Sequence, residues 1–409
     1  MTRVVITGAG CITPIGQDVA SFADSLFAGR SGIREIANRP LDIKFGRAGT
    51  VEDFPQQEWL TANQRQVAER SSAFAIASAR QAVEQSGLLA ARLTVHSGDS
   101  IAVIFGCSTG GRNTEELEYE KMYTLGGRVH PLTVPRVMAS AGTSLVSMEH
   151  GVTGPAFTLT TACASGAHAI GLAFQMVRSG AVKAALTGAH EAPLTLTFLK
   201  GWDSIKVVSP TSCRPFAADR DGMTLAEGAA VFALESLESA QARGAEILGE
   251  IAGFGMSSDA HHITQPIPAG PAAAMQRALD DAGAKPEEVG YINAHGTGTE
   301  TNDRVEAEAI HRVFGEHART LPISSTKGLH GHAIGASGAM ELLATVLALR
   351  NGMLPANAGL AEAGSQVDPE LHLDHVLLHN EAAAPELALS SSFAFGGLNA
   401  VLAVRRFEG

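Results

Sequence analysis

Apolar and polar positions alternate along this chain in two patterns, which Gly-rich turns separate. Short apolar runs of the length typical of buried strands occupy residues 3–8, 100–106, 156–161 and 183–188. Residues 69–86 instead carry Ile76, Ala79 and Val83 at helical spacing, which predicts a helix with one apolar face. Strands that alternate with helices in this way indicate the α/β fold class.

The order of these elements recurs in the second half of the chain. A helix, a strand and a Gly-rich turn at 106–111 are matched by a helix, a strand and a Gly-rich turn at 295–299. In both halves another strand and another helix follow, and these helices open near the same four letters, H-A-I-G, at 168–171 and 332–335. The repeat predicts two similar α/β lobes. We place them at residues 1–250 and 251–409.

Length, charge and composition exclude several classes of protein. The 409 residues are enough to bury a core in each lobe, and a net charge of −12 argues against a general nucleic-acid-binding surface. No apolar run reaches the ~18 residues of a membrane span, and the N-terminus lacks the apolar segment of a signal peptide. The four cysteines show no C-x-x-C spacing, which argues against a disulfide scaffold. We therefore expect a cytoplasmic protein that is not attached to a membrane.

Of the four cysteines, Cys163 has the surroundings expected of a catalytic nucleophile. It follows a predicted strand and starts a helical stripe of apolar residues that continues through Ala167, Ile170, Phe174 and Val177. A thiol at a helix N-terminus lies at the positive end of the helix dipole, which favours the thiolate and predicts a lowered pKa. Small neighbours leave room for a substrate. A lone buried cysteine is more often an inert small hydrophobe, so its position alone leaves both interpretations open.

Two histidines lie beside predicted strand ends. His295 directly follows one strand, and His332 stands in the loop between another strand and the next helix. Sites in open α/β sheets gather where strands end, so we expect Cys163 and both imidazoles to share one pocket. The alternative for any one histidine is a structural or surface role. His330, His332 and Cys163 could in principle ligate zinc, but no metal-binding spacing supports this, and we expect no metal.

A thiol and two imidazoles suit one kind of reaction. A thiolate attacks a thioester and holds its acyl group. Two neutral imidazoles can then donate hydrogen bonds to the carbonyl of a second thioester as carbon dioxide leaves and an enolate develops. The enolate attacks the bound acyl group, and backbone N–H groups must hold the resulting oxyanion. The N–H of Cys163 can supply one such donor, and the Gly-rich C-terminal turn can supply the other.

Four motifs together resemble the β-ketoacyl-[acyl carrier protein] synthases. They are T-A-C-A-S-G, N-A-H-G-T-G-T, S-T-K-x-x-x-G-H-x-x-G-A-S-G and S-F-A-F-G-G-L-N, in the order found in that family. The resemblance extends from the opening V-V-I-T-G-A-G to the end of the chain. It is greatest with class II, the elongating condensing enzymes, and residues 256–260 and 302–304 are similar to the nodulation-type or specialised-pathway branch.

This resemblance implies a fold and a set of site residues. The fold is thiolase-like, with two similar halves in a five-layered α-β-α-β-α arrangement, and forms a homodimer. The first half would supply the nucleophile Cys163 and the second half the decarboxylation pair His295 and His332. Lys327 would order the site, and Phe395 would be the gate beside the cysteine and the second donor of the oxyanion hole. The remaining implied positions are Thr297, Thr299, Phe393 and Thr109 for substrate and Glu341, Asp303 and Glu306 for support.

Several of these positions depart from the usual pattern of the family or have an alternative role. Thr109 stands where class II members often have an isoleucine that limits the acyl pocket. Ala394 replaces the glycine usual between the two phenylalanines, which should stiffen the gating loop because alanine tolerates positive φ less well. His330 stands where threonine is common. For Glu341 and Asp303, an ordinary helix salt bridge is the alternative role.

The implied activity is a decarboxylative Claisen condensation. An acyl group from acyl carrier protein would react on the enzyme with malonyl-acyl carrier protein, giving β-ketoacyl-carrier protein, carbon dioxide and free carrier in fatty-acid or polyketide-type elongation. The carrier supplies the phosphopantetheine arm, so no other cofactor is expected. Because the chain is acidic, an acidic carrier would need a local basic patch.

Related activities fit less well. A thiolase needs a second cysteine in the C-terminal turn, and an initiating synthase typically has asparagine in place of His332. A non-catalytic chain-length partner normally lacks the cysteine, and no G-x-S-x-G of a serine hydrolase occurs. A catalytic or chain-length subunit of a heterodimeric specialised ketosynthase remains the alternative. Acyl-chain length, saturation and pathway are left open.

Overall fold

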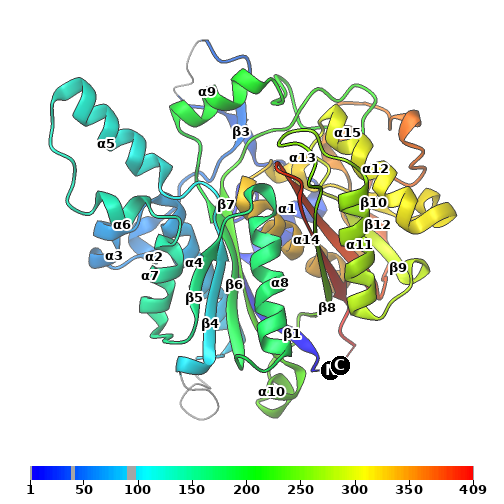
Figure 1. Ribbon diagram of the computed structural model, residues 1–409, viewed down its shortest axis with the longest axis horizontal. Helices are drawn as coiled ribbons and strands as arrows, with labels where there is room; N and C mark the ends of the chain where they lie inside the picture. The colour runs from blue at the N-terminus through cyan, green and yellow to red at the C-terminus, as the bar shows by residue number, and fades with distance from the viewer. Residues whose placement is uncertain (1, 38–41, 90–97, 409) are drawn as a thin grey trace.

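Two sets of five strands form one long mixed sheet in the computed structural model, which describes residues 2–37, 42–89 and 98–408 (Figure 1). The first set is β1 (Val4–Ile12), β4 (Ile101–Gly106), β5 (Ala156–Leu159), β6 (Ala184–Glu191) and β7 (Gly228–Ser236). The second set is β8 (Gly249–Ser258), β9 (Val289–Asn293), β10 (Ile323–Ser324), β13 (Leu387–Ala394) and β14 (Leu398–Arg405). The four strands predicted in the first half are confirmed as β1, β4, β5 and β6.

The two sets have the same topology. The sheet runs β10-β9-β13-β14-β8-β1-β7-β6-β4-β5, so each set has its third strand at the outer edge and its first strand at the centre. In both sets the three outer strands pair in parallel and the remaining pairs are antiparallel. The sets join through a short pairing of Val4–Ile6 with residues 249–251. The second copy thus begins with β8 at Gly249, close to the boundary placed at residue 250.

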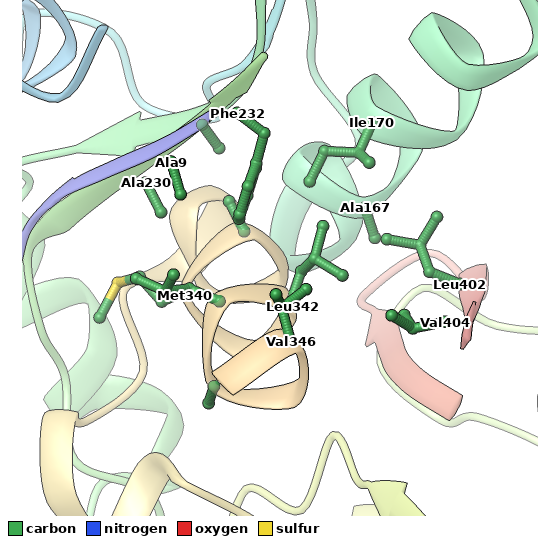
Figure 2. Close-up of a cluster of buried hydrophobic side chains, with 14 of the residues drawn as sticks. Ala9, Ala167, Ile170, Ala230, Phe232, Met340, Leu342, Val346, Leu402 and Val404 are labelled. Carbon is green, nitrogen blue, oxygen red and sulfur yellow. The ribbon is translucent and has the colours of Figure 1, made fainter. Parts of the chain in front are cut away.

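Helices cover both outer faces of the two sheet halves and fill the space between them. α4 (Arg70–Ser86) and α7 (Ala141–His150) pack on the first half, and α11 (Ala269–Ala282) and α12 (Glu300–Phe314) lie on the side of the second half (Figure 1). α8 (Ser165–Arg178) and α14 (Ser337–Asn351) lie between, and both contact strands of the two halves. Figure 2 shows this inner layer, where Ile170 and Leu342 from the helices meet Phe232 and Leu402 from the strands. The predicted α-β-α-β-α architecture is confirmed.

Glycines let two outer helices lie directly on their strands. A Cβ atom on Gly10 of β1 would lie 2.1 Å from the carbonyl oxygen of Ser78 in α4. A Cβ atom on Gly255 of β8 would lie 2.0 Å from the carbonyl oxygen of Ala274 in α11. The same close approach therefore recurs in both halves, and it accounts for part of the high glycine content.

The internal repeat has a different register from the one that H-A-I-G suggested. α8 is preceded by a 3-10 turn at Ala162–Ala164, and α14 is preceded by a 3-10 turn at Ile334–Ala336. The first residue of each turn, Ala162 and Ile334, has a φ of +48°, which is rare for residues other than glycine. Cys163 therefore corresponds to Gly335, and the true match is A-S-G-A at 164–167 and 336–339. The register taken from H-A-I-G is wrong.

The other elements lie around this framework. In the first half they are α1 (Val19–Ala28), β2 (Ile33–Glu35), β3 (Arg47–Gly49), α2 (Gln56–Trp59), α3 (Ala62–Val67), α5 (Arg112–Leu125), α6 (Thr133–Val137), α9 (Leu196–Ile205) and α10 (Leu237–Ala242). In the second half they are α13 (Lys327–His330), β11 (Met353–Leu354), α15 (Ala358–Glu362) and β12 (Glu381–Ala382). Within the described part of the chain, no helix has the length and apolar character needed to cross a membrane.

We predict that Gly255→Ala destabilises the fold by about 1–3 kcal/mol or more, because the added methyl group must displace the backbone of α11. Gly201→Ala in α9 is the matched control, since a Cβ atom there meets nothing within 4 Å and alanine favours the helix. Urea denaturation of both variants measures the difference. Equal stability of the two variants would contradict the close approach of α11 to β8.

Candidate active site

Cys163 lies in the 3-10 turn directly before α8, so the sulfur stands at the N-terminal end of a buried helix. The stripe predicted behind it is confirmed, because Ala167, Ile170, Phe174 and Val177 are all buried. Cys163 is itself only 6% exposed, and it lines a cavity of about 600 Å³. A thioester can reach this sulfur through that cavity.

The crossing of α8 and α14 brings the two halves of the site together. A Cβ atom on Gly166 would lie 2.9 Å from the carbonyl oxygen of Gly335, and one on Gly338 would lie 3.0 Å from the backbone nitrogen of Ala167. The helices therefore touch backbone to backbone at their first turns. Cys163 lies within the turn before α8 and His332 lies just ahead of the turn before α14, so the crossing places both at one cavity. That cavity is lined by seven of the predicted residues: Cys163, His295, His332, Thr297, Thr299, Phe393 and Phe395.

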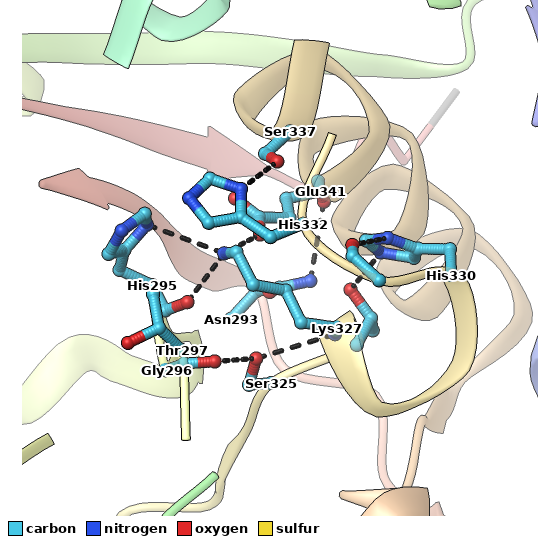
Figure 3. Close-up of polar contacts among 12 residues, drawn as sticks. Asn293, His295, Gly296, Thr297, Ser325, Lys327, His330, His332, Ser337 and Glu341 are labelled. Atoms are coloured by element: carbon cyan, nitrogen blue, oxygen red, sulfur yellow. Dashed lines mark hydrogen bonds and ion pairs between the residues drawn. The ribbon is translucent and has the colours of Figure 1, made fainter. Parts of the chain in front are cut away.

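Lys327 fixes His295 from the protein side. Its Nζ lies 3.3 Å from Nδ1 of His295 and also donates to the His295 carbonyl oxygen and to the carboxylate of Glu341 (Figure 3). An ammonium group can only donate, so Nδ1 accepts and the proton of a neutral ring sits on Nε2. Lys327 and Glu341 are both fully buried, unlike an ordinary surface salt bridge. The pair leaves His295 with an N–H donor on the ring that lines the cavity.

His332 is held in a comparable way by the helix that follows it. The Oγ of Ser337, the first residue of α14, lies 2.7 Å from Nδ1 of His332 (Figure 3). A serine hydroxyl that donates to Nδ1 leaves the proton of the neutral ring on Nε2. The two imidazole ring centroids are 5.4 Å apart, at an interplanar angle of 86°. Two rings at this spacing can both donate to one carbonyl oxygen placed between them.

Both imidazoles are neutral at physiological pH. Burial lowers the pKa of His295 and of His332 well below the usual range, and the positive charge of Lys327 lowers each pKa further. A neutral imidazole can donate a hydrogen bond without a net charge. The site therefore holds two uncharged donors beside one fixed ammonium group.

The sulfur of Cys163 is protonated in the free site. Burial raises the pKa of Cys163 to about 11, although Lys327 and the backbone N–H groups of Phe395 and of Cys163 lower it. The lowered pKa expected from the helix dipole is wrong, because desolvation of a charged sulfur outweighs the favourable dipole. The two N–H groups that act on the sulfur are the donors predicted for the oxyanion hole. Both lie next to the sulfur, and donors to an oxyanion on the carbon that the sulfur attacks must be close to it.

Two acids of α12 hold the turn that carries His295 and the threonines. Glu306 accepts a hydrogen bond of 2.8 Å from the backbone N–H of His295. Asp303 accepts one of 3.1 Å from the N–H of Thr297, and its only charged neighbour within ion-pair distance is Arg220, at 3.9 Å, among the described residues. Burial raises the pKa of Glu306 to about 7 and raises the pKa of Asp303. Asp303 thus acts mainly on backbone amides, which differs from a helix salt bridge.

The sequence that builds this site matches a defined family. Residues 1–240 match the family described as beta-ketoacyl synthase, N-terminal domain, and residues 248–361 match its C-terminal domain. The chain belongs to the β-ketoacyl synthase family. The predicted family and enzyme class, an acyltransferase-type condensing enzyme, are confirmed.

Relatives of this ketosynthase match it over its whole length. Nodulation protein E of Rhizobium sp. (strain N33) is 40% identical over 406 residues, 99% of each chain. 3-Oxoacyl-[acyl-carrier-protein] synthase 2 of Staphylococcus aureus (strain COL) is 38% identical over 419 residues, again 99% of each chain. The solved structure titled "The ishigamide ketosynthase/chain length factor" is 34% identical, with a TM-score of 0.92 and 100% of both chains covered. Both branches considered from the motifs, class II and nodulation-type, are thus among its relatives.

Thr109 is the predicted substrate residue that the structure does not bring to this cavity. Its hydroxyl donates to the carboxylate of Glu191, and its backbone N–H donates to the same side chain at 3.2 Å. Glu191 also accepts from the N–H of Ser108, whose Oγ bonds the carbonyl oxygen of Ala162 at 2.7 Å. Burial raises the pKa of Glu191 to about 7. Thr109 therefore belongs to a polar network behind the turn of Cys163.

The sequence analysis missed Glu191 and Ser337. Glu191 ends a continuously buried strand, and a carboxyl group in that position is itself a signal that it has a buried partner. Ser337 occupies the first position of its helix, as Ser165 does in α8. The repeat in its correct register would have drawn attention to both serines.

His330 has a structural role instead of a ligand role. Its Nδ1–H donates to the carbonyl oxygen of Gly331 at 2.7 Å, and its Nε2 accepts from the hydroxyl of Thr326 at 2.9 Å. Burial lowers the pKa of His330 to about 3. Within the ranges that the structure describes, no group of three or more His, Cys, Asp or Glu residues could hold a metal ion.

Proposed function

We propose that this ketosynthase joins an acyl group held on Cys163 to a malonyl unit carried by acyl carrier protein, with release of carbon dioxide. The observation that carries the proposal is the presence of one sulfur, two backbone N–H donors and two neutral imidazoles around a single cavity. Neither half of the chain contains the complete set, since the sulfur comes from the first half and the imidazoles come from the second.

In the first stage, Cys163 attacks the acyl thioester. The S–C bond forms as the thiol proton leaves, the carrier's sulfur departs, and the proton ends on that sulfur as free carrier thiol. The imidazoles do not take this proton, because the basic Nδ1 of each ring is already occupied by Lys327 or Ser337. The N–H groups of Cys163 and Phe395 support the oxyanion during attack. The products are an acyl-enzyme and one carrier with a free thiol.

In the second stage, the malonyl thioester occupies the same cavity. Its carbonyl oxygen accepts hydrogen bonds from His295 and His332, so that the electrons released by the departing carbon dioxide collect on that oxygen as an enolate. The enolate carbon attacks the acyl carbon, the new C–C bond replaces the S–C bond, and one proton from solvent restores the thiol of Cys163. The charge of Lys327, next to His295, favours the electron-rich state.

The wall of the cavity suits the pantetheine arm of a carrier. The hydroxyls of Thr297 and Thr299 lie 2.8 Å apart on that wall, where they can bond the amides of the arm. The relative named 3-oxoacyl-[acyl-carrier-protein] synthase 2 carries this carrier in its name, which supports acyl carrier protein as the partner here. No other cofactor enters either stage, because both activated groups arrive as thioesters.

We also propose that the chain forms a homodimer through the surface of α5, α6 and α7 together with edge strand β5. Large apolar side chains are exposed on these helices, including Tyr123 at 78%, Val134 at 69% and Met148 at 69%, and α5 stands clear of the sheet in Figure 1. Such a surface normally lies in an interface. The ishigamide relative, named as a ketosynthase and chain length factor, favours a heterodimer as the alternative.

Sedimentation of the purified chain distinguishes the homodimer from the heterodimer. A chain that stays monomeric alone would contradict the homodimer.

We predict that Cys163→Ala abolishes acylation and lowers condensation by at least three orders of magnitude, because it removes the one thiol among the described residues that line the cavity. Intact protein mass, measured after mixing with acyl-carrier thioesters of different chain lengths, should show one acyl adduct on the parent chain and none on the variant. The buried Cys213→Ala is the matched control and should keep the adduct. The mixtures contain a chelator and no added cofactor. Condensation by the Cys163→Ala chain, or a need for an added cofactor, would refute the proposal.

We predict that His332→Ala still accepts the acyl group but loses decarboxylation of malonyl thioester by about 10²- to 10³-fold, as expected for loss of one oxyanion donor. Carbon dioxide release is measured alongside acyl-enzyme mass. His317→Ala, a histidine of the second half that bonds the carbonyl oxygen of Val289, is the control and should release carbon dioxide at the parent rate. Unchanged release by His332→Ala would exclude its role.

A further inference from the structure

Phe395 is fixed from two sides, and one of them is an aromatic side chain from the other half of the chain. The ring of Trp202, in α9, stacks on the ring of Phe395 with centroids 5.8 Å apart and an interplanar angle of 20°. Both side chains line the cavity of Cys163. Phe395 is still 39% exposed, so the stack lies between the cavity and solvent.

The backbone around Phe395 is anchored to the second half. The N–H of Gly396 donates to the carbonyl oxygen of Ile263 at 2.7 Å, and the N–H of Asp259 donates to the carbonyl oxygen of Gly397 at 2.9 Å. Gly396 and Gly397 have φ values of +85° and +67°, whereas Ala394 is the last residue of β13. The two glycines therefore supply conformational freedom in the turn that Ala394 does not, because alanine does not readily adopt positive φ.

Trp202 is anchored to the first half. Its ring meets Phe198 edge-on, with centroids 5.9 Å apart, and it packs on a cluster that includes the buried Phe45 and Leu199. The next residue, Asp203, accepts a hydrogen bond of 3.0 Å from the backbone N–H of Lys44. Trp202 is thus part of a packed surface, and the partner with freedom to leave the stack is Phe395.

The stack of Trp202 on Phe395 affects the reaction because it holds the residue whose N–H group acts on the nucleophile. The backbone N–H of Phe395 acts on the sulfur of Cys163, so the position of Phe395 decides whether that donor is in place. Cys163 is 6% exposed, and an acyl-carrying arm that reaches it must pass residues of the cavity wall, to which Phe395 belongs. The same residue has to make way for the arm and then return its N–H to the reacting carbonyl.

We propose that Trp202 is a positioning residue that holds Phe395 over the nucleophile by aromatic stacking. We call this contact between Trp202 and Phe395 the latch. The aromatic stack opens when an acyl thioester enters and closes again around the acyl-enzyme. The inference rests on the proposed function, because it assumes that a thioester arm enters this cavity. It adds that the oxyanion donor is held by a side chain of the opposite half of the chain, so the latch spans the boundary between the halves.

The chain offers a direct probe of the latch, since it contains only two tryptophans, Trp59 and Trp202. Trp59 packs beside Phe54 and Phe74, outside the cavity lining, and Trp59→Phe leaves Trp202 as the single emitter. On mixing with acyl-carrier thioester, we expect Trp202 emission to change transiently in step with acylation. In a Trp59→Phe, Phe395→Ala double variant the stack is absent, and the emission should stay constant.

Steady-state kinetics test the same point through substitution. Trp202→Ala should lower kcat by about 2- to 10-fold, in the range of a lost aromatic pair, without raising the KM for the carrier substrate. Trp202→Phe, which can restore a stack, should recover most of kcat. Leu196→Ala, on the same helix and 46% exposed, is the matched control and should leave both constants unchanged.

The outcomes separate the latch from the proposed reaction, because acyl adducts on Cys163 are measured by mass in the same samples. Adducts that form with constant Trp202 emission, or a Trp202→Ala chain that keeps the parent kcat, would overturn the latch alone. A loss of kcat that Trp202→Phe does not restore would also overturn it. Absence of any adduct on the Trp59→Phe chain would instead refute the reaction on which the latch depends.

Discussion

The site depends on one packing constraint, the backbone contact between α8 and α14 at their first turns. Gly166 and Gly338 face each other's helices so closely that a single methyl group at either position would meet backbone atoms at about 3 Å. Because each helix is preceded by the same kind of 3-10 turn, closing this contact brings the two turns together as well. The residue positions before the helices then differ in chemistry, with a sulfur in one half and an imidazole just ahead of the other. A duplicated fold thus yields an asymmetric site without asymmetric packing.

Burial decides the electrostatics of the cavity. Desolvation keeps the sulfur protonated and both imidazoles neutral, and among the described residues the positive charge that acts on both imidazoles is that of Lys327, which pairs with Glu341. Removing one partner of such a pair would leave an unpaired buried charge, at a cost of about 3–5 kcal/mol. The pair therefore fixes the ammonium group of Lys327 beside His295. A site with few charges can bind the uncharged carbonyl groups of two thioesters in turn. Negative charge develops on their oxygens only during the reaction, and the fixed N–H donors then stabilise it.

The sequence predicted the fold class, the family and the residues of the cavity better than it predicted their energetics. The motifs around Cys163, His295 and His332 were distinctive because small residues are required where helices touch, and their order identified the family. The predicted direction of the pKa shift of Cys163 was wrong because an argument from the helix dipole leaves out burial, and burial depends on segments distant in sequence. The order of elements revealed the repeat, but the letters H-A-I-G gave the wrong register, because the match that fixes the register lies in the backbone conformation, which a single sequence does not display. Trp202 and Glu191 lie in segments without a motif, and only the folded chain shows what they contact.

The division of the site between two halves also limits how it can open. The sulfur and Trp202 belong to the first half, whereas both imidazoles and the turn of Phe395 belong to the second. The helix crossing is too tight to separate without exposing glycine backbone, so a general movement of the halves would cost the contact that assembles the site. The turn at 395–397 is different, because two glycines at positive φ supply its conformational freedom and an aromatic stack supplies part of its restraint. Access by substrate therefore falls to this turn of the second half, which touches the first half through the stack of Phe395 on Trp202.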